Sequence, residues 1–417
     1  MGVLLFEDAY VTRLHPITLC RPAYAISCGG LRLVDVASKL DLSVAGVVRS
    51  YLDEIQRQEF PHLVPRSSAT SRILINARLA PNAAMLSTLQ SIIAAQKPGA
   101  IWHDSQLVLA VLPDYLTAPE DLSGSDIPSF AREAGLPNIE LSADDGSALV
   151  LLDYPHSVIA RHQAMFTANL EYRIRSEPFQ EVTPGVFAKS GATLGQYVVS
   201  DTRCGPILLE ADSVVGPFCC LSGPLHVGAN SLIHAHSTIH PFVELGHTVK
   251  VGGELDTCVL EAYSNKQHYG YLGHSYLGSW INVGAGTTNS NLKNTYGEVN
   301  VVHGGQKIST GMRLMGCIIG DYTKTAINTA ILTGKFIGAG SMIYGFVTRN
   351  VPSFVNYAQQ FGDTTAVSLD AAISTQKRMF ARRQVPYRPC DEQLLRDLFE
   401  MTQDSRKDLA CRPPRLG

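Results

Sequence analysis

The sequence predicts two folded regions and a helical tail: an α/β domain over residues 1–165, a parallel β-helix over residues 185–350 and helices in residues 365–417. Three patterns support this division. Short strand and helix patterns alternate in the first region, aliphatic residues recur every six positions in the second, and amphipathic helical patterns fill the third. With 417 residues, the chain is long enough for two or three domains.

The first region reads as a sheet with covering helices. Apolar runs at 3–6, 72–76, 100–103 and 107–112 predict strands, and residues 82–96 have the apolar spacing of a helix. That helix is expected to end near Lys97-Pro98-Gly99. Strand, helix and strand in succession favour a mostly parallel sheet. Residues 113–147 show no clear pattern and are expected to form an irregular insertion.

The second region carries the clearest signal in the chain, a six-residue repeat. The repeated aliphatic positions are Leu209, Val215, Leu221, Val227, Ile233, Ile239, Leu245 and Val251. Three hexads make one triangular coil, whose interior is buried only when coils stack. The residue four positions after each aliphatic is mostly small or aliphatic and is expected to fill the interior as well.

Two further features of the repeat predict local structure. Glycine often follows the aliphatic residue, as at Gly216, Gly228, Gly246 and Gly252, and a sharp corner with positive φ would favour it there. The hexads stop over residues 287–312, which are polar, and resume at Ile319. A polar excursion of that length inside a regular coil is usually functional.

Composition excludes several classes of protein. The net charge is −3, so neither nucleic acid nor a membrane is expected as a partner. The chain has no apolar stretch of roughly 20 residues, and its first residues carry acids where a signal peptide would be basic, so a cytoplasmic protein is expected. Nine scattered cysteines without a CxxC pair indicate reduced thiols.

The richest chemistry lies in residues 264–294. The run HYGYLG (268–273), eight further residues and NVGAGT (282–287) resemble the pattern H-x-x-Y-L-G…N-I-G-A-G-T. That pattern belongs to the bifunctional family that acetylates glucosamine-1-phosphate and then attaches UMP, in UDP-N-acetylglucosamine biosynthesis. The resemblance covers roughly residues 185–350 and implies an acetyl-CoA-dependent acetyltransferase on a left-handed β-helix that forms homotrimers.

The resemblance implies roles for individual residues. His268 falls on the catalytic histidine, which would act as the general base, and His274 is a second catalytic candidate. Tyr271 and Asn282 fall on sugar-contacting positions, while Ala285 and Gly286 lie in the turn that meets acetyl-CoA.

This chain departs from that family on neighbouring coils. The family's lysine twelve residues before the histidine is Asp256 here, and the nearest counterpart of its arginine-proline pair is His240-Pro241. Lys266 is the residue expected to supply the missing cation. These changes concern the identity of the sugar more than the type of reaction.

The N-terminus resembles a second signature. TRLHPITLCRPAYAISCGGLRLV (12–34) is similar to the G-T-R-L-x-P-L-T…R-P-K-P-L…G-G-K-P-L run of sugar-1-phosphate nucleotidyltransferases, which have a Rossmann-like α/β fold. Arg13 and Arg21 match arginines of this signature, and one arginine can bind two phosphate oxygens at once. Three elements are missing. FEDAYV (6–11) replaces the glycine loop, Ala23 replaces the lysine, and Asn76-Ala77-Arg78 stands where a metal-binding aspartate is expected.

Both resemblances point to a divergent bacterial branch of the bifunctional family. Members of that branch share an L-F-E-D opening, an S-N-K-x-H…G-H-S-Y-L-G core and a basic helical tail. Asp8 then becomes a candidate ligand for Mg²⁺, because carboxylates suit hard cations. The alternative is that Glu7 and Asp8 are ordinary acids at the end of a strand.

Two alternatives from other classes stay open. The solenoid histidines, His226, His234, His236, His240 and His247, are dense enough for a zinc enzyme of the β-helical carbonic anhydrase type. A trimer that binds a nucleotide-sugar without turnover is the non-enzymatic alternative. The favoured prediction is a transferase of sugar-nucleotide metabolism: N-acetylation of an amino-sugar phosphate, and nucleotidyl transfer from an NTP to a sugar-1-phosphate or a vestige of that activity.

Overall fold

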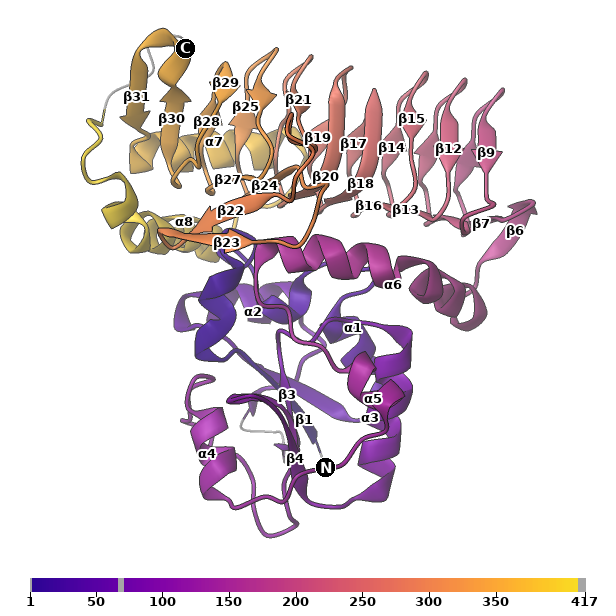
Figure 1. Cartoon of the computed structure of the whole chain (residues 1–417), viewed down its shortest axis with the longest axis vertical. Coiled ribbons are helices and arrows are strands. Elements are labelled where there is room, and N and C mark those ends of the chain that lie inside the picture. The colour runs from indigo at the N-terminus through magenta and orange to yellow at the C-terminus, as the bar shows by residue number, and fades with distance from the viewer. Residues whose placement is uncertain (1, 67–70, 412–417) are drawn as a thin grey trace. The chain divides into compact units, whose positions relative to one another are not determined.

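The computed structural model describes residues 2–66 and 71–411, which divide into two compact units, Met1–Tyr154 and Pro155–Gly417. Each unit has its own sheets (Figure 1). Each also has its own cluster of buried apolar residues. Within the described residues, the structure has no helix that is both long and apolar enough to cross a bilayer.

Unit 1 is built on a five-stranded mixed sheet with the order β2-β1-β3-β5-β4. The strands are β1 Gly2–Phe6, β2 Ser43–Val47, β3 Ser71–Asn76, β4 Gly99–His103 and β5 Gln106–Val111. β1 is parallel to β2 and β3, but β5 is antiparallel to both β3 and β4. The expectation of a mostly parallel sheet is therefore wrong for half of the pairings. The two-residue turn at Asp104-Ser105 joins β4 and β5 as a hairpin, which reverses the chain direction.

Short helices cover this sheet. They are α1 Leu33–Ala37, α2 Asp53–Glu59, α3 Ala83–Ala95, α4 Ile127–Glu133 and α5 Ala143–Ala148, with 3-10 turns at η1 Ala9–Leu14, η2 Ala23–Ala25, η3 Ser38–Leu40 and η4 Ser50–Leu52. The predicted helix over 82–96 is confirmed as α3, which begins after an Asn82 cap. Residues 113–147 are not irregular throughout, because they hold α4 and α5. Ile127 and Ala131 of α4 pack into the core of the sheet.

Unit 2 begins with α6, Pro155–Ser176, and continues as a three-sided parallel β-helix (Figure 1). Its first face holds β7 Val186–Ala188, β10 Ile207–Leu209, β13 Leu225–Val227, β16 Val243–Leu245, β24 Cys317–Ile319 and β27 Lys335–Ile337, flanked by β6 Gln180–Thr183. Its second face holds β8 Thr193–Leu194, β11 Val214–Val215, β14 Leu232–Ile233, β17 Lys250–Val251, β19 Asn265–Lys266, β25 Lys324–Thr325, β28 Met342–Ile343 and β30 Val355–Ala358, flanked by β31 Asp363–Ala366.

The third face holds β9 Val199–Asp201, β12 Cys220–Ser222, β15 Thr238–Ile239, β21 Thr288–Asn289, β26 Ala330–Ile331 and β29 Phe346–Val347. Two longer strands, β18 Glu254–Leu260 and β20 Tyr271–Leu277, start on the third face and end on the first. They bend where Thr257 and His274 adopt φ of +48° and +49°. We call the three edges the first–second, second–third and third–first corners.

The hexad prediction is confirmed. The eight repeated aliphatic residues are all at most 1% exposed, and so are the eight residues four positions later. Successive coils stay in register at an 18-residue step, as in the pairs Leu209 with Val227 and Val227 with Leu245. Stacking therefore buries one continuous core.

The explanation of the corner glycines is wrong. Positive φ falls three positions after the aliphatic residue, at non-glycine residues such as Asp212, Phe218 and His236. Gly216 is needed because the next coil passes close by: a Cβ there would lie 2.5 Å from the backbone nitrogen of Ala235. Close approach of two backbones, rather than backbone conformation, selects glycine at this position.

The polar excursion leaves the coil after β21. It carries an antiparallel hairpin, β22 Asn300–His303 and β23 Gln306–Ser309, and β24 then resumes the stack beside β20. The predicted helical tail is confirmed as α7 Leu369–Arg382 and α8 Pro389–Met401, with 3-10 turns at η6 Gln359–Phe361 and η7 Gln403–Arg406. Phe380 of α7 stacks on Trp280 at the first–second corner, and α6 covers the first face through Phe166 and Leu170 against Leu208.

Candidate functional site

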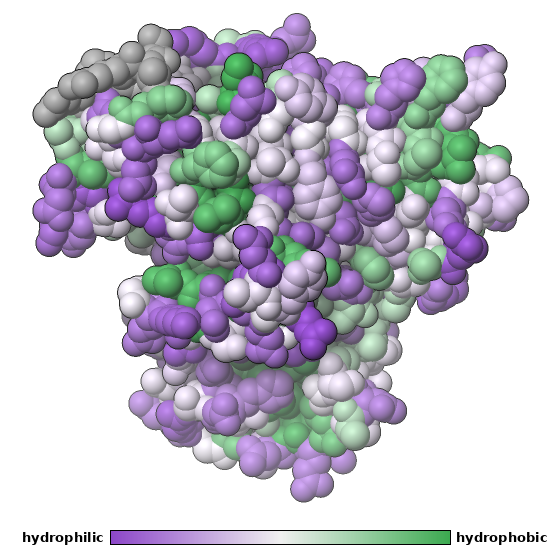
Figure 2. Space-filling model, turned by 45° about the horizontal axis from the view of Figure 1, so that its top comes forward, coloured by the Kyte–Doolittle hydropathy of each residue, from purple (hydrophilic) through white to green (hydrophobic). Residues whose placement is uncertain are grey.

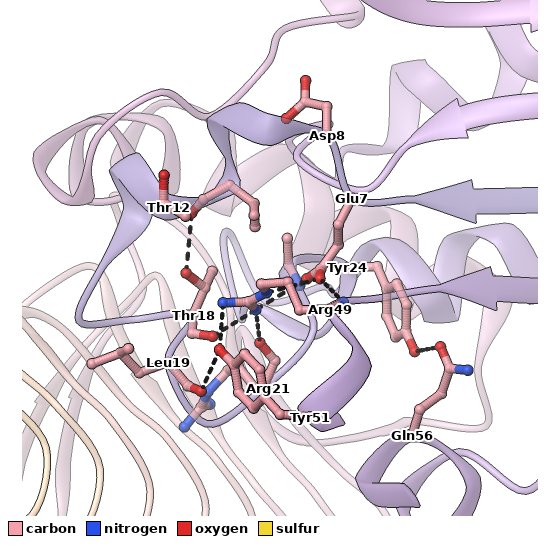
Figure 3. A network of polar contacts seen from close by, with 12 residues as sticks. Glu7, Asp8, Thr12, Thr18, Leu19, Arg21, Tyr24, Arg49, Tyr51 and Gln56 are labelled. Atoms are coloured by element: carbon pink, nitrogen blue, oxygen red, sulfur yellow. Dashed lines mark hydrogen bonds and ion pairs between the residues drawn. The ribbon is translucent and has the colours of Figure 1, made fainter. Parts of the chain in front are cut away.

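The loop of unit 1 that carries the nucleotidyltransferase-like signature, residues 12–34, is held in place by the buried ion pair between Glu7 and Arg49. Glu7 is 4% exposed and accepts hydrogen bonds from Arg49 Nε at 3.0 Å and from the backbone nitrogen of Ala23 at 2.7 Å. Arg49 also donates to the backbone oxygens of Thr18 (2.7 Å) and Arg21 (3.0 Å). Figure 3 shows Arg49 at the centre of this network. Glu7 is therefore a structural acid that fixes the loop.

The loop presents its two candidate nucleotide-binding arginines differently. Arg13 is half-buried and stacks over the ring of Tyr10 at 4.4 Å from the centroid. Arg21 is also half-buried, and its carbonyl is the part of the residue held by Arg49. The structure thus fixes the loop's backbone.

Asp8 points away from the Arg49 network (Figure 3) and is bound by a different arginine. Arg78, which is fully buried, donates from Nε to Asp8 Oδ1 at 2.8 Å and from Nη2 to Oδ2 at 2.7 Å. Asn76 Nδ2 donates to Oδ2 at 2.8 Å, and the backbone nitrogen of Tyr10 donates to Oδ1 at 3.1 Å. Both oxygens of Asp8 are occupied by donors.

These contacts do not fit a Mg²⁺ ion on Asp8. A hard cation needs several oxygen ligands, and here a guanidinium already neutralises the carboxylate. In the part of the chain that the structure describes, no cluster of three or more His, Cys, Asp or Glu side chains forms a metal site. The residue triplet Asn76-Ala77-Arg78 thus replaces a metal-binding acid with the partner of Asp8. Sequence reasoning noted the triplet but missed this pairing.

The corresponding site in unit 2 lies at the second–third corner. His268 is exposed there, and its imidazole has no hydrogen-bond partner among the described residues. Its backbone oxygen accepts a hydrogen bond from Lys266 Nζ at 2.7 Å, and the same ammonium donates to Gly252 O at 2.8 Å. The corner that carries His268 is therefore tied to the coil before it.

Lys266 lies inside the solenoid. It is 2% exposed, pairs in register with the interior residue Val251, and lines a small internal cavity with Val283 and Ile319. Burial lowers the pKa of its ammonium to about 8. An ammonium in this position supports the His268 corner from within and does not face the outer surface, where a sugar phosphate would bind.

The second half of the motif stacks on the first. Gly286 donates its backbone N–H to Tyr269 O at 2.9 Å, so Ala285 and Gly286 occupy the coil next to His268 at the same corner. Gly286 has φ +74°, and a Cβ there would meet Asn328 Oδ1 at 2.1 Å. Asn282 is exposed on the second face, where it bridges Asn265 and Lys324. The eight-residue spacing therefore brings the histidine and the glycine turn onto adjacent coils.

Tyr271 and His274 belong to a separate polar cluster that approaches the third–first corner. Asn291 Nδ2 donates to Tyr271 Oη at 2.7 Å and contacts His274 Nδ1 at 3.0 Å. Tyr271 Oη donates to Asp256 Oδ2 at 3.3 Å, and that oxygen lies 3.8 Å from His274 Nδ1. Burial raises the pKa of the Tyr271 phenol and lowers the pKa of His274, the latter partly offset by Asp256.

The two candidate histidines do not meet within one chain. His268 precedes β20, whereas His274 lies at the bend within it, six residues later. Extended chain rises about 3.3 Å per residue, so the two Cα atoms lie at opposite edges of the third face. Asp256 and Asn291 were not predicted as site residues, because one was read as a departure and the other lies in the excursion.

The solenoid histidines do not assemble a zinc site. His234 contacts Gln267 Oε1, His240 pairs with Glu254, and His236 stacks on Phe218. His226 contacts Arg173 and His247 packs on Tyr263. Among the described residues, the five rings thus have separate partners, which disfavours a zinc enzyme.

Sequence comparison relates the chain to known proteins. Residues 3–176 match the model of the sugar nucleotidyl transferase family. A bifunctional sugar-1-phosphate nucleotidylyltransferase/acetyltransferase from Sulfurisphaera tokodaii is 34% identical over 151 residues, 35% of this chain and 38% of that protein. The bifunctional protein GlmU of Paracoccus denitrificans is 30% identical over 173 residues, 40% of this chain and 38% of the relative. The match thus spans less than half the length of these curated relatives.

Among solved structures, a UDP-N-acetylglucosamine acyltransferase from Francisella novicida is similar to 56% of this chain and 92% of its own, with 12% identity and a TM-score of 0.34. The relation of this chain to known proteins rests on the sequence matches. The chain is similar in part to the bifunctional sugar-1-phosphate nucleotidylyltransferase/acetyltransferase proteins, and its residues 3–176 are similar to the sugar nucleotidyl transferase family.

Proposed function

We propose that unit 2 transfers an acetyl group from acetyl-CoA to the amine of an amino-sugar phosphate. The observation that carries this proposal is the stacking of His268 beside the Ala285–Gly286 turn on adjacent coils of a parallel β-helix. The names of the relatives agree with it.

His268 is the general base of this reaction. The amine attacks the thioester carbonyl, a C–N bond forms and the C–S bond breaks; the amine proton passes to the imidazole and then to the leaving thiolate. An imidazole suits this role because its ordinary pKa is near neutrality. Its ring is exposed and has no hydrogen-bond partner in the described part of the chain, so both nitrogens are available.

The test is acetyl transfer by the His268→Ala variant. We expect turnover to fall by a factor of roughly 100 or more, because general bases contribute that much or more. His247→Ala, an exposed histidine beside the first–second corner, is the matched control and should keep turnover. Equal turnover of wild type and His268→Ala removes His268 from this role, and no acetylation of any amino-sugar phosphate by wild type refutes the function.

For unit 1 we propose binding of a nucleotide or sugar nucleotide through the loop that carries Arg13 and Arg21, without a metal on Asp8. This is the vestigial form of nucleotidyl transfer, and the bidentate Arg78–Asp8 pair favours it over turnover. We expect UTP to raise the melting temperature of the protein equally with EDTA and with Mg²⁺. Pyrophosphate release from UTP and a sugar-1-phosphate that depends on Mg²⁺ would contradict the vestigial form.

We also propose that three copies of the chain assemble. Large apolar side chains stay exposed along the second–third corner, Tyr197, Phe218, Tyr269 and Ile327 among them. Tyr197, Phe218 and His236 stack in one column with ring centroids 4.9 and 5.2 Å apart. Figure 2 shows apolar residues, in green, on the surface of the solenoid. Exposed apolar side chains along one corner suit a partner of the same kind. Light scattering should give three times the mass of the chain.

A further inference from the structure

We propose that His274 acts as a neutral, fixed hydrogen-bond donor, whose Nε2–H binds an acceptor oxygen of the amino-sugar substrate, and that Asn291 positions it. This inference deepens the acetyltransferase function proposed above and rests on it and on the proposed trimer, because His268 and His274 of one chain lie at opposite edges of the third face. The His268 that acts on the amino sugar held by His274 therefore belongs to a neighbouring copy. It gives His274 a role other than that of a second base.

The direction of the hydrogen bonds decides the tautomer. Asp256 is a carboxylate and can only accept, so Tyr271 Oη must donate its one proton to Asp256 Oδ2. The phenol oxygen is then an acceptor, and the group of Asn291 that faces it at 2.7 Å must be the amide NH₂.

The same NH₂ group lies 3.0 Å from His274 Nδ1. Two donors cannot face each other, so Nδ1 must carry the lone pair. A neutral imidazole has one N–H, which therefore resides on Nε2. Burial keeps the ring neutral, since it lowers the pKa of His274, and Asp256 is the charged group that faces it.

The Nε2–H group remains available for a ligand. Within the described residues, Nε2 of His274 has no hydrogen-bond partner, although the side chain is only 7% exposed. The side chain of Asp256 beside it is 28% exposed. A donor next to a carboxylate matches the hydroxyl-bearing part of a sugar, whereas the carboxylate would repel a phosphate.

The first test reads the tautomer directly. We expect ¹⁵N NMR of histidine-labelled wild-type protein to show His274 protonated on Nε2, with an unprotonated Nδ1, at pH 7.5. Adding glucosamine-1-phosphate should shift the Nε2–H signal. Protonation on Nδ1 overturns the proposal, and so does an Nε2–H signal that no amino-sugar phosphate shifts.

The second test uses two amides that mimic one ring nitrogen each. The amide nitrogen of His274→Gln can occupy the place of Nε2, whereas that of His274→Asn can reach only the place of Nδ1. We expect His274→Asn to raise KM for the amino sugar about tenfold, the effect of losing one good hydrogen bond, and His274→Gln to raise KM by a much smaller factor. If both variants instead lose turnover 100-fold and flatten the pH profile, His274 is a base and the proposal fails.

The third test concerns Asn291 as a positioning residue. In Asn291→Asp, the new carboxylate accepts from Nδ1–H, so the proton should move to Nδ1 and KM should rise as in His274→Asn. A tautomer that stays unchanged in a folded Asn291→Asp variant contradicts the positioning role. Wild-type protein that binds amino sugar at His274 but acetylates nothing would refute the proposed function and leave the donor role standing, so the two failures are distinguishable.

Discussion

The two candidate sites differ in how their polar groups are used. In unit 1, Asp8 is buried and each of its oxygens accepts from Arg78 and from a second donor. In unit 2, His268 is exposed and its imidazole is unpartnered among the described residues. Both were candidates on the same kind of sequence resemblance. A side chain whose hydrogen-bonding capacity is filled stabilises the fold, whereas one that keeps its capacity is available for chemistry.

The largest expected effect concerns the buried Asp8–Arg78 ion pair of unit 1. Arg78→Met removes the partner of a buried carboxylate, and uncompensated buried charges typically cost about 3–5 kcal/mol of unfolding free energy. Denaturant unfolding of the full chain should show that loss in the transition of unit 1. The double variant Asp8→Leu/Arg78→Met should recover much of it, because the stranded charge is gone.

Arg132→Met is a matched control for Arg78→Met. Arg132 is an exposed arginine of the same unit that lies over Trp102. Its replacement should change the unfolding free energy by no more than about 0.5 kcal/mol. Equal effects of the two variants would mean that the Asp8–Arg78 pair does not stabilise unit 1.

The next effect comes from Lys266, the buried cation beneath His268. Its pKa is lowered from 10.5 to about 8 in the folded protein, so the unfolded chain binds more protons between these values. Stability must then rise as pH increases from 8 to 10.5, by about 3 kcal/mol at most. The penalty is fully present below pH 8.

Subtracting a variant isolates this contribution. Lys324 also has a lowered pKa, about 7, and adds its own rise at alkaline pH. The measured quantity is therefore the difference in unfolding free energy between wild type and Lys266→Met, followed from pH 7 to 10.5. A difference that stays constant with pH would show that Lys266 is not buried as a cation.

The smallest effect tests why glycine occupies the solenoid corners. Gly216→Ala places a methyl group against the backbone of the next coil and should cost about 1–3 kcal/mol, as overpacking does. Gly146→Ala is the control, because nothing lies within 4 Å of a Cβ there and the residue is in helix α5. That change should be neutral or stabilising by about 0.4–1 kcal/mol. A neutral Gly216→Ala would refute the close-approach explanation.

The sequence predicted the solenoid better than the sheet of unit 1. Hexads are local, and a repeated position such as Val227 meets its neighbour Leu245 on the next coil, 18 residues away. In unit 1, the pairing of β3 with β5 joins residues about 35 positions apart, and no local pattern gives its direction. Four of the five strands were found, but β2, the antiparallel pairings and the helices in 113–147 were not.

The candidate sites followed the same division. The spacing within the motif places Gly286 against Tyr269, the residue after His268, on adjacent coils, because a regular repeat turns sequence separation into position. The bond between Asp8 and Arg78 joins two strand ends 70 residues apart. Asn291 reaches His274 from the excursion, where the repeat is suspended. Long-range polar pairs of this kind need the folded chain to be recognised.

The excursion between β21 and β24 has a consequence for how such proteins diversify. β20 pairs with β24 through Tyr276 and Ile318, as two consecutive coils would without the excursion. The pairing of these coils therefore does not depend on the length of the segment between them. Segments grafted at this edge can therefore be exchanged or lengthened while the stack keeps its shape, and new specificities can arise without redesigning the scaffold.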